Sequence, residues 1–209
     1  MIGKFPDDKY RISLAMEEYE RYLDERDRRL YLTSPIDGSD DDYDMSMGTQ
    51  IVDSIIAFNR EDRDILIVER KPIRMYINSP GGDIIDGFAI VSAIKVSKTP
   101  IYTINIGQWS SMAFLIGITG HKRFSLPDMT FLMHDGHSYT FGTANKVIDK
   151  AEFDKRYEKE VIREHVLKYG KMAAEEYDRR VREEIYMLPK DALEYGFIDE
   201  IVKDVDDIL

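Results

Sequence analysis

Apolar positions recur along the chain in two alternating periods, one typical of helices and one typical of strands. Apolar side chains three or four positions apart, with charged residues between them, predict amphipathic helices over residues 10–28 and 46–59. Residues 83–96 and 110–118 are largely apolar and predict buried helices. Further helices are predicted over residues 145–169, 172–185 and 190–195. Short apolar or alternating runs predict strands over residues 30–33, 73–77, 101–106, 123–126, 130–133 and 197–202. Because strands alternate with helices, the chain is expected to form an α/β fold built on a layered sheet.

Glycines mark the ends of several expected elements. Gly81 and Gly82 follow a predicted strand, and a tight turn with positive φ angles is expected there. Gly107 is expected to end the strand over residues 101–106. Gly170 stands one residue beyond the long helical pattern, where a glycine commonly follows the helix end.

Length and composition restrict the class of protein. The chain has 209 residues, which favours a single domain over residues 1–209. Lys and Arg number 29 against 40 Asp and Glu, so the net charge is −11 and binding to nucleic acid or to an anionic membrane is disfavoured. There is no Cys, which excludes disulfides, thiolate zinc sites and thiol catalysis.

The chain also shows no sign of export or of membrane insertion. The first residues contain no apolar signal-peptide core. The longest apolar run, residues 112–118, is far shorter than the roughly 20 residues that a membrane span needs. The sequence therefore predicts a cytoplasmic protein without membrane contact, and the acidic run over residues 37–44 is interpreted as a solvated loop.

Two strand-to-helix junctions could carry chemistry. Amide groups at Gly81 and Gly82 could stabilise an oxyanion, although a plain tight turn explains the same pair. Ser110 and Ser111 open an apolar helix directly after a strand, where the helix dipole favours an oxyanion. A simple N-cap is the alternative interpretation, and the residues alone do not say which serine would be the nucleophile.

A histidine supplies the third candidate. His134 directly follows a strongly apolar strand, which makes it a possible general base. The spacing of His134 and His137 hints at a metal, but no third ligand has suitable spacing, so neither a metal nor a cofactor is expected. The sequence holds 40 carboxylates, and composition does not single out one of them as the orienting acid. The residues alone thus indicate a serine hydrolase without a complete triad.

Five motifs occur in a fixed order along the chain. They are Met75-Tyr-Ile-Asn-Ser-Pro-Gly-Gly82, Gly107-Gln-Trp-Ser-Ser-Met112, Lys122-Arg-Phe-Ser-Leu-Pro127, Phe131-Leu-Met-His134 and Glu194-Tyr-Gly-Phe-Ile-Asp199. Together they resemble the proteolytic subunit of the Clp protease, the ClpP family of serine peptidases. The resemblance covers about residues 20–202, which is nearly the whole chain.

The resemblance implies a crotonase-like ClpP fold of stacked ββα units with a protruding strand-helix handle at about residues 137–169. It also implies a Ser-His-acid mechanism. The family's nucleophile precedes a methionine and maps to Ser111, and its base maps to His134. The amides of its oxyanion hole map to Gly82 and Met112.

The position of the family's catalytic acid in this chain follows from its spacing to the motif that begins at Glu194. An alignment without a gap places Glu184 where the family has aspartate, and a shift of register would bring in Glu183 or Asp178 instead. A glutamate can serve as the acid of such a triad.

The chain departs from the family pattern at three further places. Asp135-Gly136 replaces the usual Gln-Pro pair after the histidine. Trp109 stands where a small residue is usual, so a bulky ring is expected near the nucleophile. Residues 1–18 match poorly, although the family's N-terminal segment lines an axial entrance.

The resemblance further implies a partner and an assembly. The chain contains no P-loop motif of its own, so a separate AAA+ unfoldase of the Clp type would supply ATP hydrolysis. Two stacked heptameric rings would enclose active sites that cut unfolded polypeptides into short peptides. A catalytically weak or structural subunit of a mixed ring is the main alternative. The aligned serine and histidine disfavour an acyl-CoA enzyme of the crotonase type, and the lack of a membrane-facing segment disfavours a Ser-Lys peptidase.

Overall fold

The computed structural model describes residues 26–37, 46–137 and 140–209. Its centre is a sheet with the strand order β1-β2-β3-β4-β7, to which β5 is added beside β3 and β6 beside β5. The strands are β1 (Arg29–Leu32), β2 (Ile73–Ser79), β3 (Ile101–Ser110), β4 (Lys122–Ser125), β5 (Thr130–Met133), β6 (Ile185–Met187) and β7 (Glu200–Ile201). All of these neighbours pair in parallel except β5 and β6, which are antiparallel. The predicted α/β fold is confirmed, and the structure adds that its sheet is mostly parallel.

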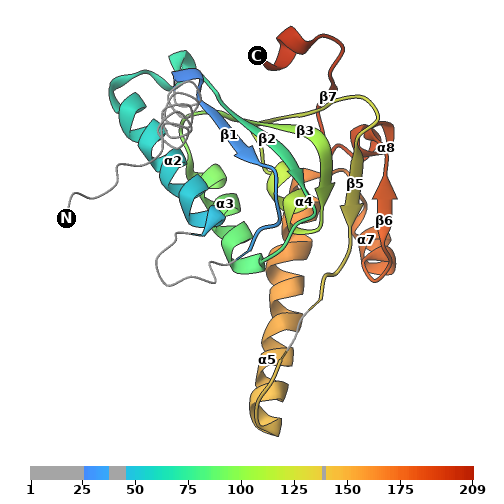
Figure 1. Ribbon diagram of the computed structural model, residues 1–209. Helices are drawn as coiled ribbons and strands as arrows, with labels where there is room; N and C mark the ends of the chain where they lie inside the picture. The colour runs from blue at the N-terminus through green and yellow to red at the C-terminus, as the bar shows by residue number, and fades with distance from the viewer. Residues whose placement is uncertain (1–25, 38–45, 138–139) are drawn as a thin grey trace, which may run out of the picture.

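Helices cover the sheet and extend beyond it. They are α2 (Met47–Glu61), α3 (Ile84–Val96), α4 (Met112–Gly117), α5 (Ala144–Tyr157), α6 (Glu164–Tyr169), α7 (Ala174–Arg180) and α8 (Pro189–Glu194). Figure 1 shows α2 and α3 lying side by side against one face of the sheet, with α4 behind its lower edge. Three short 3-10 turns, η1 (Asp62–Asp64), η2 (Ile67–Glu69) and η4 (Val205–Ile208), lie in the described connections and at the C-terminus.

The two faces of the sheet contribute to two apolar clusters. Ile73, Met75 and Ile77 alternate along β2 and belong to the large core beneath the helices. Tyr76 belongs instead to a smaller cluster that includes the C-terminal Ile208. The hydroxyl of Tyr76 donates a hydrogen bond to the carbonyl of Ile208 at 2.7 Å, so the C-terminus is held against the sheet.

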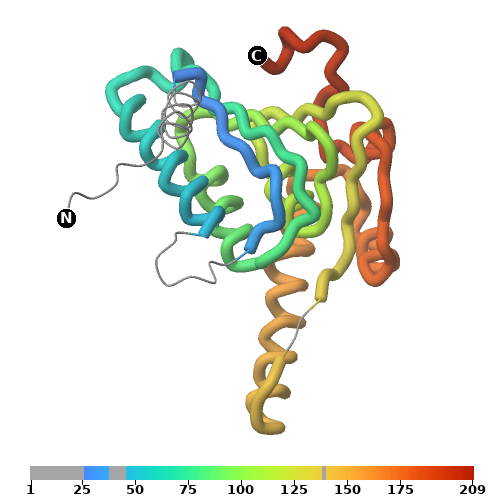
Figure 2. Tube along the Cα trace, in the orientation of Figure 1, coloured from blue at the N-terminus to red at the C-terminus, as the bar shows by residue number. Residues whose placement is uncertain are grey.

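One long helical stretch projects from the body. Helix α5, a π-helical segment (η3, Glu158–Arg163) and α6 follow one another without a break, as predicted for residues 145–169. Figures 1 and 2 show α5 extending well below the sheet, and none of its side chains is buried. Gly170 does follow the helix, but its φ of −122° is ordinary extended backbone. A side chain there would collide with the ring of Phe197, so packing explains this glycine.

Three of the element boundaries predicted from the sequence are wrong. Strand β3 continues through Gly107 to Ser110, because Gln108, Trp109 and Ser110 pair in parallel with β5. Side-chain oxygens of Asn105 and Asn78 accept from the amides of residues 107 and 108. The helix expected over residues 172–185 ends at Arg180, and the strand β6 that follows was not expected. The strand expected over residues 197–202 is reduced to Glu200–Ile201.

Two expectations concern parts of the chain outside the described residues. Most of the helix predicted over residues 10–28 lies there, and only its last residues, Arg26 and Asp27, are described and helical. Most of the acidic run over residues 37–44 lies there as well. Among the helices of the described ranges, none is long and apolar enough to cross a membrane.

Candidate active site

Ser111 stands at a strained turn between β3 and α4. Its backbone has φ 55° and ψ −122°, outside the conformations that a residue with a side chain adopts without cost. It occupies the N-cap position of α4, yet its side chain makes no capping hydrogen bond. The capping role considered from the sequence therefore does not account for this serine. Strain of this kind is concentrated at functional sites.

The two adjacent serines have different surroundings. The hydroxyl of Ser110 donates to the side-chain oxygen of Gln108 at 3.0 Å, and Ser110 is only 7% exposed. Ser111 is partly exposed, and its hydroxyl has no hydrogen-bond partner among the described residues. The structure thus favours Ser111 over Ser110 as a nucleophile without reference to any other protein.

The glycine pair after β2 packs directly against this turn. Gly81 and Gly82 have φ angles of 93° and 146°, as the sequence predicts. A Cβ atom on Gly81 would lie 2.8 Å from the amide nitrogen of Met112 and 2.8 Å from the Cβ of Ser111. Any side chain there would push the two segments apart.

Two amide groups at this junction are free to bind an anion. Within the described part of the chain, the N–H groups of Gly82 and Met112 donate to no acceptor. The neighbouring groups do have partners: the Gly81 carbonyl accepts from Ile36 at 2.9 Å, and the Asp83 amide donates to the Ile36 carbonyl at 2.6 Å. Free N–H groups beside a serine are suited to stabilising the oxyanion of acyl transfer.

His134 is brought to the same place by strand β5. The amide of Ser111 donates to the carbonyl of Leu132 at 2.9 Å, which fixes the serine beside the end of β5. His134 directly follows β5 and lies two residues after Leu132, so the two side chains are expected on the same face of the sheet. No hydrogen bond joins Ser111 to His134 in the described structure. Contacts of this kind are commonly long before substrate binds.

The second histidine of the His-x-x-His spacing lies close to the first. The ring centroids of His134 and His137 are 5.7 Å apart in an edge-to-face arrangement. No group of three or more His, Asp or Glu side chains in the described ranges is placed to hold a metal ion. The pair therefore gives no structural argument for a metal.

Glu184 approaches His134 through strand β6. In the antiparallel pair β5–β6, Met133 lies opposite Ile185, so His134 and Glu184 are the next opposed positions. The carboxylate of Glu184 accepts a hydrogen bond from the hydroxyl of Tyr186 at 2.8 Å, and no hydrogen bond to His134 is present. Strand β6 was not predicted from the sequence, because its local signal is only an apolar-polar-apolar alternation over three residues.

The two alternative acids are engaged elsewhere. Both oxygens of the Asp178 carboxylate accept from Arg163, at 2.7 and 3.0 Å, and this arginine lowers the pKa of Asp178. Glu183 lies 3.8 Å from Arg180 on the preceding helix. These contacts favour Glu184 as the carboxylate that faces His134.

Trp109, the bulky residue that precedes the two serines, is fully buried in the core. It packs edge-to-face on Phe131 with 5.4 Å between ring centroids, and it fills the space left by Gly117. The indole nitrogen has no acceptor in the described structure.

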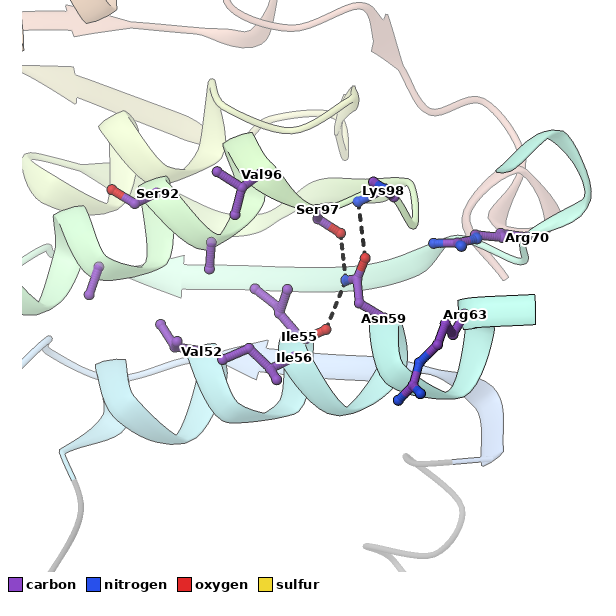
Figure 3. Close-up of a pocket in the computed structure, with 12 residues that line it drawn as sticks. Val52, Ile55, Ile56, Asn59, Arg63, Arg70, Ser92, Val96, Ser97 and Lys98 are labelled. Atoms are coloured by element: carbon purple, nitrogen blue, oxygen red, sulfur yellow. Dashed lines mark hydrogen bonds between the residues drawn. The ribbon is translucent and has the colours of Figure 1, made fainter. Parts of the chain in front are cut away.

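An apolar groove lies apart from this site, between α2 and α3. It has a volume of about 620 Å³, and Val52, Ile56 and Val96 contribute to its lining (Figure 3). Asn59 bridges the two helix ends there by donating to the Ser97 hydroxyl at 2.8 Å. Neither the serine, the histidine nor the glutamate described above lines this groove.

The fold and the site together are typical of serine hydrolases: a parallel sheet presents a serine at a strand-to-helix turn, with free amides and a histidine beside it. Comparison with known families identifies the particular family. The family model described as Clp protease matches residues 19–205. The chain belongs to the Clp protease family, and the resemblance found in the sequence is confirmed.

Several curated relatives support the same assignment. ATP-dependent Clp protease proteolytic subunit 2 of Treponema denticola is 36% identical over 155 residues, covering 70% of this chain and 76% of the relative. The subunit of the same name from Thermobifida fusca is 28% identical, with 79% of each chain covered. The ATP-dependent Clp protease proteolytic subunit of Lactococcus lactis is 30% identical over 202 residues, covering 90% of this chain and 89% of the relative.

Family membership fixes the broad activity. The chain is a serine peptidase, the proteolytic core of a Clp-type protease, and its sheet and helices are consistent with the ClpP fold. The alternative of a structural subunit without activity is not favoured.

Proposed function

We propose that Ser111, His134 and Glu184 form the catalytic triad of this peptidase, and that the amides of Gly82 and Met112 form its oxyanion hole. The observation that carries this proposal is a strained turn at Ser111, where the Ser111 hydroxyl and the amides of Gly82 and Met112 have no hydrogen-bond partner among the described residues. A structural serine would use its hydroxyl in a cap or a local hydrogen bond, as Ser110 does.

The reaction follows from these positions. His134 takes the hydroxyl proton as the Ser111 oxygen attacks the peptide carbonyl, and the two amides bind the oxyanion that forms. The C–N bond then breaks, and the imidazolium returns its proton to the leaving amine. Water, deprotonated by the same histidine, releases the acyl group. Glu184 holds the imidazole in the required tautomer and stabilises its charge.

The partners proposed for the chain are those that the sequence implies. A Clp-type AAA+ unfoldase would deliver unfolded polypeptides, since the relatives are named as subunits of ATP-dependent proteases. We assign residues 137–169 to a handle that joins two stacked heptameric rings. The exposed apolar side chains Ile148 and Phe153 on α5 are suited to such a contact. We also place the whole chain, residues 1–209, in a single peptidase domain that acts in the cytoplasm, with neither nucleic acid nor a membrane among its partners.

A comparison of the two serines tests the triad. Hydrolysis of a fluorogenic apolar peptide and labelling by a fluorophosphonate probe are measured for wild type, Ser111→Ala and Ser110→Ala. Ser111→Ala should abolish both signals, because the nucleophile is lost. Ser110→Ala should retain labelling, since it loses only the contact with Gln108. Loss of labelling in Ser110→Ala alone would refute the assignment.

A further inference from the structure

We propose that Tyr186 is a positioning residue for the proteolytic reaction, which holds the carboxylate of Glu184 in the orientation that serves His134. This proposal rests on the triad proposed above. It adds a residue that does not touch the substrate and acts through the acid.

The contact itself is direct. The phenol oxygen of Tyr186 lies 2.8 Å from Oε2 of Glu184 and donates a hydrogen bond to it. The neighbouring carboxylate raises the pKa of the Tyr186 phenol, so the tyrosine keeps its proton and remains a donor at neutral pH. One oxygen of the carboxylate is thereby fixed, and Oε1 is left to accept from the imidazole.

The strand register places this contact beside the reacting groups. Tyr186 lies opposite Leu132, whose carbonyl accepts from the Ser111 amide. The side chains of residues 184 and 186 lie on the same side of β6, because successive side chains of a strand point to opposite faces. The phenol, the carboxylate and His134 therefore share one face of the β5–β6 pair.

Packing does not explain the tyrosine. Its side chain is 68% exposed, whereas its strand neighbours Ile185 and Met187 are buried in the core. A glutamate has one more rotatable bond than an aspartate, and an exposed glutamate loses rotamer freedom when it is held in place. The hydroxyl of Tyr186 supplies that restraint for a residue whose length alone would leave it mobile.

The test compares two tyrosine substitutions that each remove a phenol–glutamate hydrogen bond. Tyr186→Phe should lower kcat about tenfold with little change in KM, because a hydrogen bond to a charged group is lost while the ring stays. Tyr195→Phe is the matched control. It removes a 2.7 Å bond to Glu176 on α7 and a 3.1 Å bond that the Tyr195 hydroxyl accepts from Arg180, neither of which involves the proposed triad, and it should leave kcat unchanged.

A second background separates positioning from a structural role. In the Glu184→Asp variant the carboxylate is one methylene shorter and loses its reach to the phenol, so adding Tyr186→Phe should change kcat less than twofold. An equal loss of kcat in both backgrounds, or no loss in wild type, overturns the proposal. The thermal unfolding midpoint and the assembly size are measured for each variant, and kcat is compared only among variants that match wild type in both.

Failure of this proposal can be told apart from failure of the triad. If Ser111→Ala and Glu184→Gln abolish turnover while Tyr186→Phe has no effect, the triad stands and the positioning role is overturned. If Glu184→Gln is fully active, the assignment of the acid is wrong, and the role of Tyr186 is overturned with it.

Discussion

Replacing His165 with leucine should make the folded protein less sensitive to acid. His165 lies in α6, is 3% exposed, and its Nε2 atom is 3.0 Å from the carbonyl of Leu115 and 3.1 Å from the hydroxyl of Thr119. Burial is the main cause that lowers its pKa from 6.5 to about 4, and the nearby Lys95 and Lys168 act in the same direction. The neutral form is therefore the one that the fold stabilises.

The size of the effect follows from linkage between protonation and folding. In the unfolded chain His165 gains a proton near pH 6.5, while in the folded chain it does so only near pH 4. Its contribution is fully present above pH 6.5 and is lost as the pH falls towards 4. At ~1.4 kcal/mol for each pKa unit, the loss is about 2 kcal/mol at pH 5 and approaches roughly 3 kcal/mol below pH 4.

Urea unfolding at about pH 7.5 and about pH 5 measures this loss directly. Other carboxylates and histidines also titrate, so the quantity of interest is the difference between wild type and His165→Leu. Leucine removes the titrating group, and Thr119 still donates to the Leu115 carbonyl at 2.7 Å, so that carbonyl keeps a partner. Wild type should lose about 2 kcal/mol more than the variant over this range. Equal losses would refute the reasoning.

Two further substitutions test the site. Gly81→Ala should reduce kcat by at least about 100-fold and should also slow the fluorophosphonate reaction. A Cβ at this position would lie 2.8 Å from the Cβ of Ser111 and 2.8 Å from the Met112 amide nitrogen, and would displace a proposed oxyanion donor. Wild-type rates in this variant would contradict the reasoning. Glu184→Gln should reduce peptide hydrolysis strongly with assembly intact. Asp178→Asn should leave hydrolysis unchanged and stability nearly so, because the Asp178 side chain is 55% exposed and solvent screens its pairing with Arg163. The reverse pattern in the same peptidase assay would show that the alignment register of the acid is wrong.

Much of the fold was readable from local patterns. The strand at Ile73 and the helix that follows Gly82 were placed correctly, because apolar spacing and glycine turns are properties of neighbouring residues. Strand β6 was missed, since three residues carry too little periodicity to be distinguished from the end of a charged helix. Its pairing with β5 comes from residues more than fifty positions away.

The choice between Ser110 and Ser111 shows the same division. The residues alone placed both serines at a strand-to-helix junction and left the nucleophile open, and the family resemblance selected Ser111. The structure distinguishes the two serines by another route, because the chain turns through a positive φ at Ser111 and directs the Ser110 hydroxyl to Gln108, which supports the proposal of Ser111. Such a backbone reversal depends on Gly81 packing against the turn, which no local pattern reports.

The sequence by itself determined the family, the α/β class and the order of the motifs, because these depend on residue types and their spacing along the chain. Only the tertiary structure decided that Ile185 on β6 lies opposite Met133 on β5, that Trp109 fills the core, and that Tyr186 reaches Glu184. These are contacts between segments far apart in the chain or between side chains whose direction is set by a strand's register. They exist only once the sheet has formed.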